Sequence, residues 1–415
     1  MRKINLESNN YLIILNLLFL LFLSSCSWKE GVTLRWEPDL KYVKQEMMQK
    51  EISLKINHEL SITFGEKMDR IIEDLPKYEN DDQVKIELSK AVASIGQLHT
   101  SLELGNEDVL PFILYMSQDK LYVIDTLQQY SYILFAELTE INHQPVERIV
   151  KQLKDVVSRD NEQGLFVEIP SHIVRYSILH GLGVIEDHDK IPVTFLLEDG
   201  SKTSISVPLV YQGDSTIRLI NPYKENLFYK KLGDTNYEYK YLPRENTLYA
   251  AYNSCYTDPN YSIEQYSRDI VRTINHFPVK KIIIDLRNNR GGNSDVIQPL
   301  VKELSELPKI KNNIIVLIGR YTASSAMANA IELRSTLNAI LIGEPANGDP
   351  NKPGDILSFR LHESGLTVNY STKEFHLLET KEKALNPDIL VNLTISDIRK
   401  GVDPVLTKAL EYTFN

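Results

Sequence analysis

The sequence predicts a multidomain protein of mixed class, with an α/β core in the C-terminal part, a helical N-terminal domain and a β-rich middle domain. Three short apolar, β-branched runs at 282–284, 314–318 and 339–342 are typical of strands buried on both faces. Helix-length segments separate these runs, which indicates a parallel sheet with crossover connections. The 415 residues, 42% of them hydrophobic, suffice for two or three domains.

The overall composition excludes some classes of protein. The formal net charge is −10 and no basic block is present, which argues against a nucleic-acid partner. The two cysteines, Cys26 and Cys255, are too few for a disulfide framework. No cluster of His, Cys and Asp has the spacing of metal ligands, so we expect neither a metal nor an organic cofactor.

Residues 1–26 are predicted to be a signal segment. A positive start, Arg2-Lys3, precedes an apolar run at 11–23 that is too short to span a bilayer. The run ends in Leu23-Ser24-Ser25-Cys26, which resembles a bacterial lipoprotein signal; the alternative is an ordinary anchor with a chance cysteine. Lipidation of Cys26 would place the protein outside the cytoplasm, on a membrane of the cell envelope, with Cys255 as a lone thiol.

A helical domain is predicted for residues 27–110. Apolar residues recur at helical spacing and stop first at Pro76 and then at Gly96, a residue that commonly follows a helix end. His99 comes just after this second end, where a rigid helix terminus can fix a general base. Of the nine histidines, His99 is the main candidate, and His58 is more typical of a helix cap.

Short strands dominate the predicted middle domain, residues 111–245. Asp199-Gly200 lies between two alternating runs and predicts a hairpin. The segment 138–153 resembles the second half of a PDZ module, although the carboxylate-binding loop of a PDZ domain is not evident. Peptide binding and a β-rich spacer therefore both remain open for this domain.

The domain 246–415 carries two polar features at the carboxyl ends of its predicted strands, where α/β sheets usually place their sites. Gly291-Gly292 can take positive φ and bring backbone N–H groups close to a ligand. Ser324 precedes a predicted helix whose free amides and dipole favour an oxyanion. A serine beside two sets of backbone donors suits acyl transfer; the alternative is an N-cap serine and a plain turn. Cys255 is interpreted as a buried or semi-buried apolar residue and not a nucleophile.

Several motifs in this order resemble the S41 family of tail-specific (C-terminal processing) proteases and tricorn-type serine peptidases. The resemblance covers Thr247 to the C-terminus, with a second patch at 93–100 that precedes the core in many members. It implies a crotonase/ClpP-like catalytic core, peptidase activity, and a peptide or unfolded protein substrate lying as an added strand. The motifs are Asp285-Leu286-Arg287-Asn288-Asn289-Arg290-Gly291-Gly292, Thr322-Ala323-Ser324, Gly343-Glu344-Pro345 and Gly401-Val402-Asp403-Pro404-Val405-Leu406.

The choice of general base depends on a position where the sequence differs from the tail-specific proteases. Tail-specific proteases use a Ser–Lys dyad with the lysine in a Gly-Lys step, which here is Gly348-Asp349. Lys352 follows three residues later in a Pro-rich loop, where a mobile lysine would stay charged and inert. The tricorn-like arrangement is therefore favoured: Ser324 as nucleophile and His99 as base.

The remaining roles complete the expected site. The expected oxyanion donors are the amides of Gly291 or Gly292 and of Ser325, and Asp285 with Arg287 forms a bracing ion pair. The group that orients His99 is expected to be Glu382; the alternatives are Glu379, Glu344, Thr100 and Ser101.

The expected function is a serine peptidase that works through an acyl-enzyme on Ser324. Two alternatives stay open. In the first, departures at Gln97-Leu98, Arg290 and Asp349 have removed activity, and an inactive lipoprotein only binds peptides. In the second, the same core is an acyl hydrolase that does not act on peptides.

Overall fold

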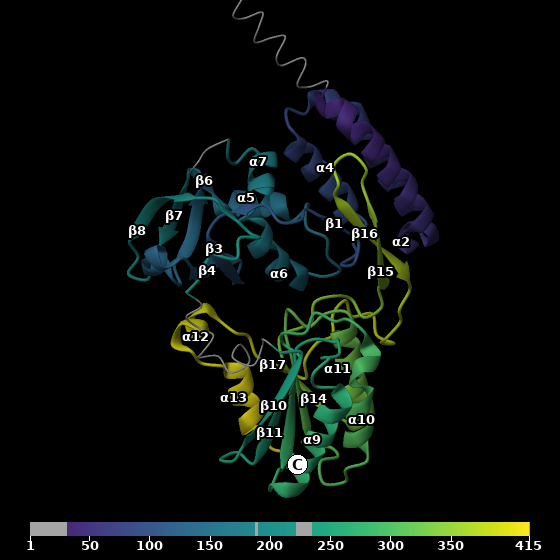
Figure 1. Cartoon of the computed structure of the whole chain (residues 1–415), viewed down its shortest axis with the longest axis vertical. Helices are drawn as coiled ribbons and strands as arrows, with labels where there is room; N and C mark the ends of the chain where they lie inside the picture. Colours follow the sequence, from purple (N-terminus) through teal and green to yellow (C-terminus); the bar gives the residue numbers. More distant parts are fainter. Residues whose placement is uncertain (1–30, 187–189, 221–234, 415) are drawn as a thin grey trace, which may run out of the picture.

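The computed structural model describes residues 31–186, 190–220 and 235–414. The predicted signal segment 1–26, including Cys26, lies outside the described residues. Figure 1 shows a helical N-terminal part, a β-rich middle part and a C-terminal α/β part. The mixed multidomain class predicted from the sequence is confirmed.

The C-terminal part is built on a six-stranded sheet of order β10-β11-β12-β13-β14-β17. The pairings from β11 to β17 are parallel, and β10 is antiparallel to β11. All positions of β12 and β13 are buried, as expected for the continuously apolar runs. The strands are β10 (Tyr237–Leu242), β11 (Thr247–Tyr252), β12 (Lys281–Asp285), β13 (Ile314–Ile318), β14 (Ile340–Gly343) and β17 (Ile389–Leu390).

Helices cover both faces of this sheet. Alternate residues of β12, such as Ile282 and Ile284, pack against α9, α10 and α11. Ile283 faces the other way, toward α13. The helices are α9 (Ile263–His276), α10 (Gln298–Ser305), α11 (Ser325–Leu337), α12 (Ile395–Lys400) and α13 (Pro404–Glu411), with a 3₁₀ turn η3 (Ser294–Ile297).

The N-terminal part is helical as predicted, but it also includes a hairpin from the C-terminal region. β15 (Gly354–Arg360) and β16 (Thr367–Lys373) form a three-stranded sheet with β1 (Ser101–Glu103). The apolar side chains of the hairpin belong to the core of the N-terminal helices, and Figure 1 shows β15 and β16 beside α2 and α4. The structure therefore differs from a continuous 246–415 domain. The helices are residues 31–50, α2 (Ile52–Ile56), α3 (His58–Asp74), η1 (Leu75–Lys77) and α4 (Asp81–Ala93).

The middle part contains the order β3-β4-β5-β7-β8, with β6 paired to β5. The predicted hairpin at Asp199-Gly200 joins β7 and β8. Within the segment 138–153, the apolar positions of α5 are buried. The strands are β2 (Asp108–Val109), β3 (Phe112–Ser117), β4 (Lys120–Thr126), β5 (Glu137–Ile141), β6 (Gln144–Pro145), β7 (Lys190–Leu196), β8 (Lys202–Pro208) and β9 (Val210–Tyr211). The helices are η2 (Gln128–Ile133), α5 (Val146–Leu153), α6 (Gln163–His172) and α7 (Tyr176–Gly181).

None of the helices in the described part of the chain is long and apolar enough to cross a membrane.

Candidate active site

Ser324 lies at a sharp turn between β13 and α11. Its φ of 51° and ψ of −128° place a non-glycine residue in a strained backbone conformation. Such strain at a serine that opens a helix is a known way to present a nucleophile. The Ser324 side chain makes no capping hydrogen bond. The N-cap alternative from the sequence therefore does not describe this serine.

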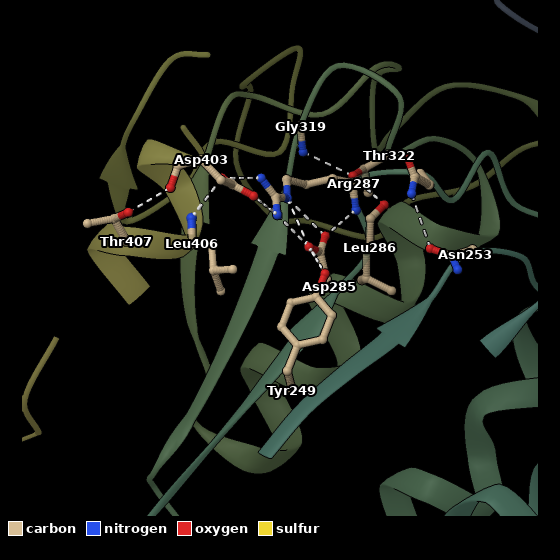
Figure 2. Close-up of polar contacts among 11 residues, drawn as sticks. Tyr249, Asn253, Asp285, Leu286, Arg287, Gly319, Thr322, Asp403, Leu406 and Thr407 are labelled. Carbon is tan, nitrogen blue, oxygen red and sulfur yellow. Dashed lines mark hydrogen bonds and ion pairs between the residues drawn. The ribbon is translucent and has the colours of Figure 1, made fainter. Parts of the chain in front are cut away.

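Backbone contacts hold this turn on both sides. The Ala323 amide donates to the Asn289 carbonyl at 3.2 Å, and the Asn347 amide donates to the Thr322 carbonyl at 2.9 Å. The Thr322 hydroxyl donates to the Leu286 carbonyl at 2.9 Å (Figure 2). The turn thus has little freedom to relax its strain.

A buried ionic network supports the loop that follows β12 (Figure 2). The Arg287 guanidinium contacts Asp285 at 2.6 Å and donates to both carboxylate oxygens of Asp403 at 2.8 Å. The Tyr249 hydroxyl donates to Asp285 at 2.6 Å. The expected Asp285–Arg287 ion pair is present, and Asp403 extends it to the start of α13.

The glycine loop passes very close to Ser324. A Cβ added at Gly291, which has φ 109°, would lie 2.8 Å from the Ser324 Cβ. A Cβ added at Gly292 would lie 2.6 Å from the Cys255 carbonyl oxygen. Both positions therefore require glycine.

The hydrogen bonds of this loop exclude one of the expected oxyanion donors. The Gly291 amide already donates to the Asn289 side-chain oxygen at 2.9 Å, so it does not face the cleft as a free donor. The amides of Gly292 and Ser325 donate to no other group in the described residues. Both residues line the cleft described next, and they remain candidates for stabilising an oxyanion.

A cleft of about 720 Å³ connects the three parts of the molecule. His99 reaches it from the N-terminal part, Asp160 from the middle part, and Ser324 and Lys352 from the C-terminal part. The two principal sequence candidates, more than two hundred residues apart in the chain, therefore line one cleft. Polar and apolar groups both line it, among them Arg290, Asp349, Met327, Phe375 and Leu377.

The group expected to orient His99 is not brought to it. The Nδ1 atom of His99 is buried and has no hydrogen-bond partner among the described residues. Glu382 is exposed and accepts a hydrogen bond from Asn386 at 3.0 Å, and it does not line the cleft. Glu379 is exposed as well.

The other three alternatives have partners of their own. Glu344 is buried in an ion pair with Arg320 at 2.7 Å. The Thr100 hydroxyl donates to Glu51 at 2.6 Å, and the Ser101 hydroxyl accepts from Asn369 at 3.3 Å. The sequence-based candidates therefore leave the His99 Nδ1 without a carboxylate.

Asp160 was missed by the sequence analysis, although it lines the same cleft. It lies in the loop between α5 and α6, and it accepts a hydrogen bond from the Leu98 amide at 2.7 Å and one from the Asp349 amide at 3.2 Å. Burial raises the pKa of the Asp160 carboxyl above its usual range, against the opposing effect of those two amides and of nearby His99 and Lys352. No motif in the sequence marks this residue.

Lys352 also lines the cleft, and the expectation of a mobile loop lysine is wrong. Its ammonium donates to the Gly96 carbonyl at 3.0 Å, and the side chain is partly buried. Lys352 is therefore fixed on the turn that carries His99.

Cys255 is fully buried beneath the glycine loop, as the sequence indicated. Its thiol contacts Asn289 at 3.5 Å and Asn329 at 3.4 Å. Burial raises the pKa of Cys255 to about 11, so the thiol stays protonated near neutral pH and is a weak nucleophile.

Among the described residues, no group of His, Cys, Asp and Glu is arranged to hold a metal ion.

Comparison with solved structures identifies the fold. Mature CPAF superposes with a TM-score of 0.65 over 92% of this chain and 97% of that chain, at 13% sequence identity. The chain therefore has the same fold as mature CPAF. The s499a mutant of CPAF gives the same TM-score at 12% identity, over 92% of this chain and 99% of that chain.

Another solved structure matches less well. The photosystem II D1 C-terminal processing protease matches with a TM-score of 0.42 at 10% identity, over 86% of this chain and 92% of that chain. No family model and no curated protein matches the sequence.

Proposed function

We propose that this protein is a serine peptidase whose nucleophile is Ser324 and whose general base is His99. The observation that carries the proposal is the strained Ser324 turn in the same cleft as His99, with the Gly292 and Ser325 amides beside it. The sequence motifs that resemble S41 peptidases support this proposal, and so does the fold that the chain shares with mature CPAF.

The proposed reaction has two stages. The Ser324 hydroxyl oxygen attacks the peptide carbonyl while the His99 imidazole takes its proton. The oxyanion is held by the Gly292 and Ser325 amides. His99 then gives the proton to the leaving amine, and water hydrolyses the acyl-enzyme in the same way.

The substrate is proposed to be an extended segment of a peptide or an unfolded protein. Gly354 and Ile356 of β15 line the cleft, and Ile356 and Leu357 are about half exposed. Within the described residues, the edge of β15 opposite β16 carries no strand. An extended peptide could pair with this edge and present its carbonyl to Ser324.

The proposal is tested with Ser324→Ala and His99→Ala. The wild type is expected to hydrolyse unfolded protein and to be labelled by a fluorophosphonate. Ser324→Ala should abolish both, and His99→Ala should lower turnover by a factor of at least about a hundred. His58→Ala is the matched histidine control and should leave turnover unchanged.

Lys352 provides an internal check on the base. Lys352→Arg keeps a donor for the Gly96 carbonyl, so it should retain much of the activity if His99 is the base. Complete loss in Lys352→Arg together with full activity in His99→Ala would contradict the proposal.

A second function is favoured by one observation: the buried His99 Nδ1 has no acceptor. In this reading the cleft binds peptides without cutting them. A folded wild type that resists fluorophosphonate, hydrolyses nothing and still binds unfolded protein would support it. Hydrolysis of simple esters without any peptide cleavage would instead support an acyl hydrolase.

We also propose that the protein is lipid-anchored outside the cytoplasm through Cys26. The support is the leader pattern in residues 1–26, which lie outside the described residues. Membrane fractionation of wild type and Cys26→Ser tests this, because the variant should move to the soluble fraction.

A further inference from the structure

The turn that carries His99 is held by groups from two other parts of the molecule. Asp160, from the middle part, accepts the Leu98 amide at 2.7 Å. Lys352, from the C-terminal part, donates to the Gly96 carbonyl at 3.0 Å. The residues on either side of this short turn are therefore fixed by side chains that both line the cleft.

Asp160 also holds the loop 346–349. Its second carboxylate oxygen accepts the Asp349 amide at 3.2 Å. The side chain of Asn161, the next residue, donates to the Gly348 carbonyl at 2.9 Å and to the Ala346 carbonyl at 3.2 Å. The middle part is thus docked onto this loop by two adjacent residues.

The same loop is bonded to the serine turn. The Asn347 amide donates to the Thr322 carbonyl at 2.9 Å, two residues before Ser324. A continuous series of contacts therefore runs from the His99 turn through Asp160 and the loop 346–349 to Ser324.

The two hydrogen bonds that the side chain at position 160 accepts explain why this residue is an aspartate. Two backbone N–H groups approach the two oxygens of one side chain, and an ionised carboxylate is acceptor-only. An asparagine would accept one amide and present its own N–H₂ to the other. Taking a carboxylate partly out of water is unfavourable, so its presence at the cleft favours a role in the site over a role in stability alone.

We propose that Asp160 is a positioning residue that fixes the His99 turn relative to Ser324, with Lys352 as the second anchor of the turn. This inference rests on the proposed serine peptidase function. Asp160 acts through the Leu98 and Asp349 amides.

The kinetic test compares wild type, Asp160→Asn, Asp160→Glu and the control Glu162→Gln in the full chain. Glu162 lies two residues away, is well exposed and does not line the cleft. Asp160→Asn is expected to lower kcat between about tenfold and a hundredfold, because small displacements of a catalytic group have effects of this size. KM should change less than about twofold, and Asp160→Glu, which keeps both acceptor oxygens, should recover part of kcat.

A merely structural role gives a different pattern. It lowers the melting temperature and the final extent of fluorophosphonate labelling, and kcat per labelled site stays at the wild-type value. That pattern, or an unchanged kcat in Asp160→Asn, would overturn the proposal.

Amide hydrogen exchange separates this inference from the proposed function. Asp160→Asn should increase exchange in peptides covering 96–100 and 346–350, and Glu162→Gln should not. Unchanged exchange in Asp160→Asn refutes the anchoring even in an active enzyme. Increased exchange in a chain without Ser324-dependent turnover supports the anchoring, and in that case the peptidase proposal is the one that fails.

Discussion

At the scale of single residues, Ser324 has a strained backbone that neighbouring residues hold in place. Its backbone conformation costs about 1–3 kcal/mol for a non-glycine residue, which persists only where the surroundings over-determine it. Asn289 and Asn347 supply those surroundings through hydrogen bonds to the peptide group that joins Thr322 and Ala323. Gly291 allows the neighbouring loop to approach the Ser324 Cβ.

Gly291→Ala tests this close approach. The added methyl would lie 2.8 Å from the Ser324 Cβ at a φ of 109°, so the serine turn must move. We expect kcat/KM to fall by a factor of about a hundred, since a shift near 1 Å has this effect. Gly183→Ala is the control, because Gly183 also has positive φ but no neighbour within 4 Å of an added Cβ. Equal activity in the two variants would show that the approach is unimportant.

The residues that the sequence predicted are those with local signals. Ser324 and His99 each follow a recognisable motif or helix end, and they line one cleft. Asp160 had no such signal, because its contact with Leu98 joins residues 62 positions apart across two parts of the chain. Glu382 was expected from a motif context, but its side chain is exposed and contacts Asn386.

At the scale of elements, the Arg287 network joins the end of β12 to the start of α13. Asp403 also accepts the Leu406 amide at 3.0 Å and so caps α13. Burial alone would raise the pKa of Asp403, but the Arg287 guanidinium and the amides of α13 hold it below its usual range. The motif Gly401-x-Asp403-Pro404 therefore has a structural explanation.

Asp403→Asn tests this network because asparagine preserves the cap and removes the charge. The wild type is expected to be more stable by about 3 kcal/mol near neutral pH. A carboxyl with a depressed pKa adds stability above its unfolded pKa of about 4, and this stability is lost as the pH falls through the lower folded value. The difference between the two proteins should therefore shrink below about pH 4, as measured by urea unfolding.

The exposed ion pair between Lys44 and Asp69 provides the control. Asp69→Asn should change stability by less than about 1 kcal/mol at either pH. A pH-independent difference between wild type and Asp403→Asn would contradict the ionic account.

At the scale of the whole molecule, the sequence predicted the three parts and the parallel core but not the path of the chain between them. Short apolar runs are local signals, and β12, β13 and β14 lie where they predict. The hairpin β15–β16 follows the core in sequence and packs with the N-terminal helices, because its apolar face completes their cluster. No local pattern indicates which cluster a hairpin will join.

A fragment of residues 246–415 is therefore expected to be unstable by itself. It leaves Phe359, Leu361, Val368 and Tyr370 without the helices that bury them. We expect this fragment to aggregate or to bind a hydrophobic dye, whereas the chain 31–415 stays monodisperse. Replacing 354–373 by a short Gly-Ser linker should reduce dye binding. A monodisperse, dye-negative fragment with the hairpin intact would show that the C-terminal part folds independently.

The pairing of β1 with β16 sets an order of events during synthesis. Ser101, two residues after His99, contacts Asn369 across 268 positions of sequence. At ordinary ribosomal speeds this interval takes roughly 15–50 s. During that time β1, which follows His99, has no partner strand, and the cleft is incomplete. The proposed active site is therefore complete only after most of the chain has left the ribosome.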